Sequence, residues 1–462
     1  MGFTRRGSMI IQYRSSATDE WRRVTKLERF HDDRDAWGVI RIFAGSDIGY
    51  TLFEDDDGRT EVHRFDYSTG ELGETVYAHD TRDVDSLLFH DGELVGAGYV
   101  DDAPATHWFD PVLGGQHARL KAALAGGEVS FVSMSDDGRK ILVRHGGAND
   151  PGALYVFSPG EGKLDLYGNY RPGIDHRALS EPKPIAFTAR DGTKLTGYLT
   201  LPRGREARNL PLILYPHGGP YGLRDAMIYD DWLQLLAARG YAVLQVNYRG
   251  SGGAGRAFEE LGYGQIGMAM QDDLDDAVRW AAGQGTIDAG RVCIVGASYG
   301  GYAALWGTIR NPELYRCGVS YAGVTDYQEQ MRYDRNYLGR AFYRRYWRER
   351  VEGEDWRNLD TISPVKNVSR IVRPIMVAHG RNDRRVPFEQ YNVLHRAVVR
   401  TDKPVEFHAY DDGHSFANQE NEEKFLTAMV TFLEKHNPPY PGESRATTDG
   451  NEAQPASGAG GD

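Results

Sequence analysis

The chain contains Gly296-Ala297-Ser298-Tyr299-Gly300 directly after the apolar run Val292-Cys293-Ile294-Val295. The run predicts a buried strand, and apolar residues at helical spacing after the pentapeptide predict a helix. A Gly-x-Ser-x-Gly sequence between a strand and a helix is typical of a sharp turn that lifts a serine hydroxyl out of a sheet. Both glycines fit, because larger side chains would clash across such a turn. We therefore predict that Ser298 is a nucleophile, rather than a serine in an ordinary Gly-rich turn.

A base and an orienting carboxylate are needed to activate a serine hydroxyl. In this kind of fold they follow the serine in the order acid, then histidine. Asp383 follows an apolar strand and His414 follows the last predicted strand, so both face the sheet edge at which such folds bind ligands. We predict Asp383 as the acid and His414 as the base. Asp411 and Asp412 compete for the acid role, although we expect them to face solvent or to cap the turn.

A second Gly-rich segment, His217-Gly218-Gly219-Pro220, follows an early apolar strand. Acyl transfer builds negative charge on a carbonyl oxygen, and backbone N–H groups aimed at that oxygen stabilise it. In this fold one N–H belongs to the residue after the nucleophile and another to a loop of this type. We predict that Tyr299 and Gly219 donate these hydrogen bonds. For the tetrapeptide alone, a plain turn would be the default interpretation.

Five ordered motifs give residues 181–436 a specific resemblance to a known family. The motifs are His217-Gly218-Gly219-Pro220, Asn247-Tyr248-Arg249-Gly250-Ser251-Gly252-Gly253, Gly296-Ala297-Ser298-Tyr299-Gly300-Gly301, His379-Gly380-Arg381-Asn382-Asp383-Arg384-Arg385-Val386-Pro387 and Gly413-His414-Ser415-Phe416. In them the chain resembles the catalytic domain of the prolyl oligopeptidase family of serine peptidases, in its acylaminoacyl-peptidase and dipeptidyl-aminopeptidase-like branch. The resemblance implies that Ser298, Asp383 and His414 form a catalytic triad.

The resemblance also implies groups that hold the substrate. Arg385, two residues past the acid, would clamp a substrate carbonyl with its planar donors, although it could equally be a surface arginine. In the family, the stretch that corresponds to the Tyr- and Arg-rich residues 325–360 helps to form the pocket for the residue before the scissile bond. Phe342 and Tyr346 fall where an aromatic pocket wall is expected. A solvated helix with one packed face is the alternative for this segment.

Strands and helices alternate from about residue 177 onward, which predicts an α/β-hydrolase catalytic domain over residues 177–437. The apolar runs are not strictly alternating, so we expect mostly parallel strands covered by helices on both faces. Predicted strands lie at 193–201, 210–216, 242–247, 292–295, 317–321, 374–378 and 405–410, and predicted helices at 230–238, 269–282, 300–309, 387–400 and 421–435. The tail, residues 438–462, is rich in Pro, Gly, Ser, Ala and acidic residues and is predicted to be disordered.

The first 176 residues carry an internal repeat that begins at Phe65, Phe109 and Phe157. Each copy follows a short apolar strand, and the spacing of about 45 residues is the period of β-propeller blades. The family also has an N-terminal β-propeller, which is larger and closed. We predict an all-β partial β-propeller of three to four blades, with a small β-sandwich as the alternative. Three explanations of its small size are left open: the chain is a fragment, a partner chain supplies the missing face, or the array of sheets is reduced.

Composition excludes some classes of function. The 462 residues include 54 Lys and Arg against 66 Asp and Glu, a formal net charge of −12, which disfavours nucleic acid as a partner. No apolar stretch approaches the roughly 20 residues that span a bilayer, so no membrane is expected. The N-terminus lacks an apolar signal core, which suggests a cytoplasmic location. We expect Cys293 and Cys317 to be small core side chains, rather than a disulfide or a metal pair.

Together these features predict a serine peptidase that hydrolyses short peptides or acylaminoacyl substrates through an acyl-enzyme intermediate. No metal or other cofactor is expected, and a homo-oligomer is possible. A carboxylesterase with the same triad and a catalytically silent, propeller-based binding protein are the alternatives. Arg385 and the propeller favour the peptidase, because both belong to peptide-handling enzymes.

Overall fold

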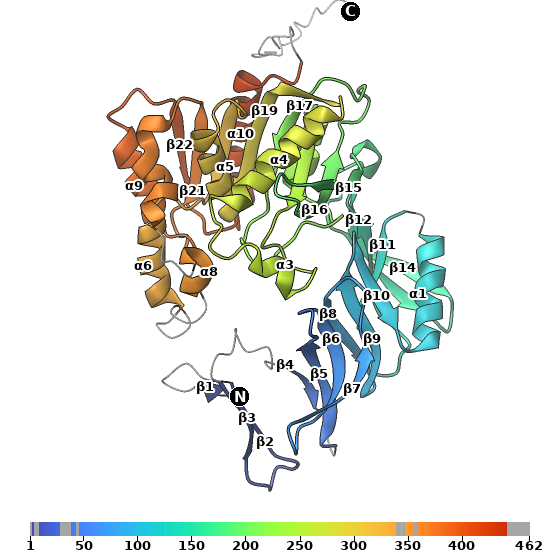
Figure 1. Ribbon diagram of the computed structural model, residues 1–462. Coiled ribbons are helices and arrows are strands. Elements are labelled where there is room, and N and C mark those ends of the chain that lie inside the picture. Colours follow the sequence, from blue (N-terminus) through green and yellow to red (C-terminus); the bar gives the residue numbers. More distant parts are fainter. Residues whose placement is uncertain are drawn as a thin grey trace, which may run out of the picture.

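The computed structural model describes residues 2–3, 9–27, 38–42, 46–124, 126–338, 343, 347–353 and 358–440 (Figure 1). Within these ranges, no helix is both long enough and apolar enough to cross a membrane. The predicted tail begins at residue 438, and Arg205 donates a hydrogen bond of 3.0 Å to the Pro439 carbonyl. Its remaining residues, 441–462, lie outside the described part of the chain.

An eight-stranded sheet forms the C-terminal part in the order β15-β16-β18-β17-β19-β20-β21-β22. The strands from β18 to β22 in this order run parallel, whereas β15 and β16 pair antiparallel at one edge. Their bounds are β15 (Pro182–Thr188), β16 (Lys194–Thr200), β17 (Leu210–Leu214), β18 (Ala242–Asn247), β19 (Ile287–Ala297), β20 (Cys317–Tyr321), β21 (Ile375–Gly380) and β22 (Val405–Tyr410). The sequence missed β15 because its two prolines look like a linker, but an edge strand tolerates proline.

Helices cover both faces of this sheet, which confirms the α/β-hydrolase prediction (Figure 1). On β17 the fully buried side chains alternate: Leu212 and Leu214 belong to one apolar core, and Ile213 belongs to the other. The first core also contains residues of α4 (Ala269–Gly283), α5 (Tyr299–Arg310) and α9 (Glu389–Val398). The second contains residues of α2 (Asp231–Ala238) and α10 (Gln419–His436).

Small antiparallel sheets make up the N-terminal part, as expected for a partial β-propeller. The orders are β1-β2-β3, β4-β5-β6-β7, β10-β9-β8 and β11-β12-β13-β14. The bounds are β1 (Gly2–Phe3), β2 (Met9–Tyr13), β3 (Arg22–Leu27), β4 (Gly38–Ile42), β5 (Ile48–Glu54), β6 (Thr60–Asp66), β7 (Glu71–Tyr77), β8 (Val84–His90), β9 (Glu93–Val100), β10 (Pro104–Trp108), β11 (Glu128–Met134), β12 (Ile141–Gly147), β13 (Asp150–Ser158) and β14 (Lys163–Asn169). Phe65 and Phe157 lie near the ends of β6 and β13, each before a turn into the next strand.

The repeat that begins at Phe109 departs from the all-β expectation, because it leads into helix α1 (Pro111–Ala123). The Asp110 carboxylate caps this helix by accepting hydrogen bonds from the N–H groups of Val112 and Leu113, at 2.7 and 3.0 Å. Pro111 occupies the first turn, where its missing N–H costs nothing. A helix therefore follows β10 where the other two copies have a strand.

The N-terminal sheets contact loops that follow β17 and β18 of the large sheet (Figure 1). Arg256, at the start of α3 (Arg256–Glu260), makes two hydrogen bonds to the Glu54 carboxylate, at 2.6 and 2.8 Å. The N–H of Met227 donates to the Asp102 carbonyl at 2.6 Å. These loops follow the carboxyl ends of parallel strands, where α/β folds bind ligands. The N-terminal sheets are thus anchored beside that edge.

The two cysteines form a disulfide, so the expectation that they are separate core side chains was wrong. Cys293 of β19 and Cys317 of β20 are register partners with their Cα atoms 4.8 Å apart. Register partners on neighbouring parallel strands point to the same face of the sheet. The sequence could not reveal this pairing, because a whole helix separates the two strands along the chain.

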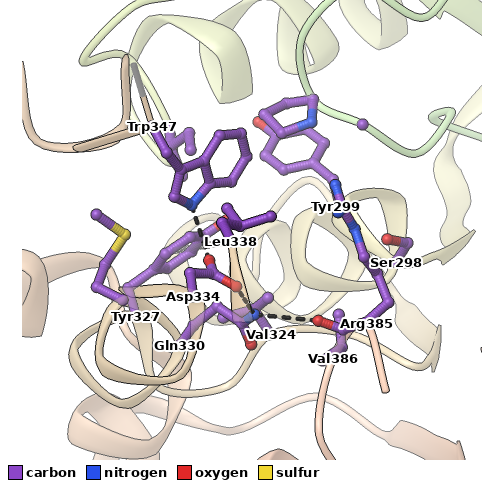
Figure 2. Close-up of a pocket in the computed structure, with 14 residues that line it drawn as sticks. Ser298, Tyr299, Val324, Tyr327, Gln330, Asp334, Leu338, Trp347, Arg385 and Val386 are labelled. Carbon is purple, nitrogen blue, oxygen red and sulfur yellow. Dashed lines mark hydrogen bonds between the residues drawn. The ribbon is translucent and has the colours of Figure 1, made fainter. Parts of the chain in front are cut away.

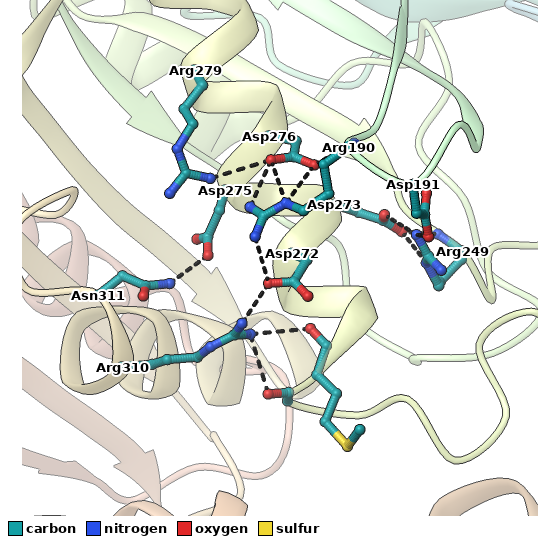
Figure 3. A network of polar contacts seen from close by, with 12 residues as sticks. Arg190, Asp191, Arg249, Asp272, Asp273, Asp275, Asp276, Arg279, Arg310 and Asn311 are labelled. Carbon is teal, nitrogen blue, oxygen red and sulfur yellow. Dashed lines mark hydrogen bonds and ion pairs between the residues drawn. The ribbon is translucent and has the colours of Figure 1, made fainter.

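A buried ion pair joins the loop after β18 to helix α4 (Figure 3). The Arg249 guanidinium makes two hydrogen bonds to the Asp273 carboxylate, at 2.7 and 2.8 Å, and the Arg249 N–H makes a third. Asp273 is fully buried, whereas Asp191, which also binds Arg249 at 2.8 Å, is 45% exposed. One arginine thus has a buried partner that accepts three hydrogen bonds and a partly exposed partner that accepts one.

This difference gives a prediction for stability. Asp273→Asn leaves a buried arginine without its charged partner, so it should lower the free energy of unfolding by about 3 kcal/mol. The matched control, Asp191→Asn, removes a partly exposed partner of the same arginine and should cost less than about 1 kcal/mol. Urea unfolding followed by circular dichroism measures both. Equal costs for the two variants would contradict the assigned role of burial.

Candidate active site

The turn after β19 has the strained backbone that the sequence predicted. Ser298 has φ 58° and ψ −121°, in the region that glycine favours, and α5 begins at the next residue. A Cβ on Gly296 would lie 2.5 Å from the backbone of Gly300, and one on Gly300 would lie 2.2 Å from the Pro216 carbonyl oxygen. The glycines are therefore required, at Gly296 by the turn itself and at Gly300 by the neighbouring loop.

Asp383 and His414 are joined by a hydrogen bond of 2.7 Å between Oδ2 and Nδ1. Asp383 is only 6% exposed, and its Oδ1 accepts hydrogen bonds from the N–H groups of Arg385 and Val386, at 2.8 and 2.9 Å. Burial pushes the pKa of the Asp383 carboxyl upward, but hydrogen bonds from His379 and His414 outweigh it and hold that pKa well below its usual range. The site thus contains an ionised carboxylate that is hydrogen-bonded to one nitrogen of an imidazole.

The two competing carboxylates have other partners. Asp412 accepts hydrogen bonds from the N–H groups of Gly413, Ala417 and Asn418, and so caps the turn that carries His414. Asp411 accepts a hydrogen bond of 2.8 Å from the Asn382 side chain. The structure therefore brings Asp383 to the histidine, and not Asp411 or Asp412.

Ser298 and His414 lie at the same edge of the sheet. Tyr321, at the end of β20, connects their loops: its carbonyl accepts the Ser298 N–H at 2.9 Å, and its hydroxyl donates to the Gly413 carbonyl at 3.2 Å. Within the described residues, no hydrogen bond joins the Ser298 hydroxyl to His414. Catalytic hydrogen bonds are often long in unliganded enzymes and tighten when substrate binds.

The predicted oxyanion loop lies against Ser298. A Cβ on Gly218 would lie 3.5 Å from the Ser298 Cβ, and Gly219 lines the same pocket as Ser298 and Tyr299. His217 links this loop to the loop after β18, because its Nε2 forms a hydrogen bond of 2.9 Å with the Ser251 hydroxyl.

Burial lowers the pKa of His217 to about 4, so this histidine is neutral at neutral pH. Its ring stacks on Tyr248, whose hydroxyl also donates to the His217 carbonyl at 3.0 Å. Tyr248 and Ser251 flank the buried Arg249, so the ion pair with Asp273 also holds the loop behind the nucleophile.

A pocket opens beside Ser298 (Figure 2). Arg385 lines it, as the resemblance implied, and so does Trp347. Phe342 and Tyr346, the expected aromatic wall, lie outside the described residues. Most of the remaining lining is apolar and comes from Pro220, Ile266, Val324, Tyr327, Met331, Leu338 and Val386.

Sequence reasoning missed two polar residues of this pocket, Gln330 and Asp334. Both lie on α6 (Tyr327–Tyr337), one helical turn apart. Residues four apart on a helix share a face, and Asp326 before them is a typical helix cap, so the pattern was available in the sequence. It was hidden among the many tyrosines and arginines of the segment. The described residues contain no group of three or more His, Cys, Asp or Glu placed to hold a metal ion.

Comparisons with known proteins agree with this fold. A sequence model described as the Prolyl oligopeptidase family matches residues 229–438. Dipeptidyl aminopeptidase BIII of Pseudoxanthomonas mexicana is 33% identical over 83% of this chain and 58% of its own length. Dipeptidyl peptidase family member 6 of Caenorhabditis elegans is 26% identical, over 91% of this chain and 60% of its own length.

Among solved structures, the acylaminoacyl peptidase of Pyrococcus horikoshii has a TM-score of 0.70 at 18% identity, over 95% of this chain and 67% of that one. The chain spans 58 and 60% of the length of the two curated relatives named above. The family match covers the strands and helices that carry Ser298, Asp383 and His414. Residues 229–438 of the chain belong to the prolyl oligopeptidase family.

Proposed function

We propose that the chain is a serine peptidase that hydrolyses short peptides or acylaminoacyl substrates through Ser298, His414 and Asp383. The observation that carries the proposal is the 2.7 Å hydrogen bond between Asp383 and His414, at the sheet edge where the strained turn presents Ser298. A buried carboxylate that fixes one imidazole nitrogen leaves the other free to act as a base. The names of the relatives, which are peptidases, support this chemistry.

The first half of the reaction forms an acyl-enzyme. Ser298 Oγ attacks the scissile carbonyl carbon while His414 Nε2 takes the hydroxyl proton. The N–H groups of Gly219 and Tyr299 stabilise the negative charge that develops on the carbonyl oxygen. His414 then gives its proton to the departing amine, and the C–N bond breaks. The Asp383 carboxylate stabilises the positive imidazole during both transfers.

The second half hydrolyses the ester. Water attacks the acyl carbon while His414 again accepts a proton, and the same two N–H groups hold the oxygen. The Ser298 oxygen leaves and recovers its proton from the histidine. The guanidinium of Arg385 makes no hydrogen bond or ion pair to another described side chain, so it is available for a substrate carbonyl.

We propose that residues 1–176 form a cover beside this edge and that residues 177–437 form the catalytic domain. Contacts of Glu54 and Asp102 with the loops after β18 and β17 support the arrangement. Such a cover should favour short peptides over folded proteins. A carboxylesterase remains the competing activity, and matched peptide and p-nitrophenyl ester substrates distinguish the two.

Two expectations from the sequence stay predictions. A cytoplasmic location is opposed by the Cys293–Cys317 disulfide, because such bonds persist mainly in oxidising compartments. A homo-oligomer is supported by Leu166 and Tyr167, which are 56 and 74% exposed on β14, the last strand of its sheet.

Replacing the nucleophile gives the first prediction for activity. Ser298→Ala should lower kcat/KM for a chromogenic peptide by about a thousandfold or more, because no hydroxyl remains to form the acyl-enzyme. The unfolding midpoint should not fall, since no hydrogen bond of the Ser298 side chain is lost. Retention of a tenth of the activity or more would remove Ser298 from the proposed mechanism.

The pH dependence of the rate gives the second prediction for activity. A histidine base must be neutral to accept the Ser298 proton, so kcat/KM should rise through a single ionisation as the pH is raised from acid to neutral. Asp383 should contribute no second step there, because its pKa lies well below the usual range. The measurement is a pH–rate profile under conditions where chemistry limits the rate. A flat profile over this range would argue against a histidine base.

A further inference from the structure

Two buried polar side chains line the mostly apolar pocket beside Ser298, which Arg385 also lines (Figure 2). Gln330 and Asp334 are 6 and 5% exposed. Buried polar atoms cost free energy unless they find hydrogen-bond partners. The partners of these two side chains therefore indicate what a substrate would have to supply.

Both hydrogens of the Gln330 amide are used. Gln330 Nε2 donates to Asp334 Oδ1 at 2.9 Å and to the Arg385 carbonyl at 3.2 Å. Because both of these neighbours are acceptors, the nitrogen end of the amide must face them, and a flipped amide would place oxygen against oxygen. The other end, Oε1, is thereby fixed, and it is buried without a hydrogen-bond partner among the residues that the structure describes.

Asp334 also presents acceptors. Its Oδ2 receives a hydrogen bond of 2.7 Å from the Trp347 indole, and its Oδ1 receives the one from Gln330. A carboxylate has about four acceptor positions, so each oxygen can take a further donor. Burial raises the pKa of Asp334, while hydrogen bonds from Trp347 and Gln330 and the charge of Arg385 act in the opposite direction. The N–H groups of Gln330 and Trp347 that face this carboxylate are already engaged.

We propose that Gln330 and Asp334 make this pocket select a lysine or arginine at the residue before the scissile bond, an inference that rests on the proposed peptidase activity. The aliphatic stem of such a side chain matches the walls formed by Val324, Met331 and Val386. Its terminal N–H donors would satisfy Gln330 Oε1, and its charge would compensate Asp334. Arg385 lines the same pocket and opposes a second cation, so the preference depends on the Asp334 charge.

The test compares lysine with norleucine, which has the same straight aliphatic stem but no ammonium group. Ala-Lys and Ala-Nle amides of aminomethylcoumarin, each with a free and an acetylated N-terminus, give kcat/KM values for the full chain. Since an unpaired buried acceptor costs about 1–3 kcal/mol, lysine should be favoured by about ten- to a hundredfold. Equal rates, or faster cleavage after norleucine, would overturn the proposal.

Two variants separate selection from a structural role. Asp334→Asn should bring the lysine-to-norleucine ratio close to one. Glu329→Gln, an exposed carboxylate on the same helix, is the matched control and should leave the ratio unchanged. If Asp334→Asn lowers both rates equally, together with the unfolding midpoint, the residue is structural and the proposal fails.

Binding keeps this test independent of catalysis. Isothermal titration of the Ser298→Ala variant with the same lysine and norleucine peptides should give the same preference without turnover. Hydrolysis of neither amide, combined with tighter binding of the lysine peptide, would leave the subsite standing and remove the peptidase. Hydrolysis of both amides without a preference would support the peptidase activity and exclude the lysine-selective subsite.

Discussion

The backbone contact between the turn at Ser298 and the loop before Gly218 constrains the rest of this structure. Gly300 approaches the Pro216 carbonyl so closely that a Cβ there would lie 2.2 Å from the oxygen. This contact brings Ser298, the N–H of Tyr299 and the Gly218-Gly219 segment to one place. Positive φ at a serine is sparsely populated and costs of order 1–3 kcal/mol, so it persists only where the surrounding structure fixes it.

The central strands and buried polar contacts hold the backbone of Ser298 in this conformation. Parallel pairing of β17, β19, β20, β21 and β22 places the loops that follow them at one edge. The pair of Arg249 with Asp273 holds the segment behind His217, and the N–H groups after Asp383 hold its carboxylate. The site is thus carried by elements whose own positions are set by burial. The polar groups of the proposed subsite differ from these, because some of their acceptor positions remain available to a ligand.

Much of the catalytic part could be predicted from the sequence, because its features are local. Apolar runs predicted the parallel strands, and the glycines around Ser298 predicted the strained turn. Long-range pairing could not be read in this way. Cys293 and Cys317 are neighbours only because β19 and β20 pair in one register, and the prolines of β15 are tolerated only because that strand is at an edge. In the N-terminal part, the Asp110-Pro111 pair started a helix that the repeat pattern had concealed. The role of Gln330 and Asp334 could be inferred only from the structure, because the sequence does not show that these side chains line a pocket.

Covalent labelling would show whether the turn after β19 presents Ser298 as an activated nucleophile. The full chain would be treated with a fluorophosphonate, digested, and its peptides identified by mass spectrometry. We expect one adduct, on the Ser298 oxygen, with labelling that is lost when His414 is replaced by alanine. Absence of an adduct, or an adduct on another serine at the same rate, would contradict it.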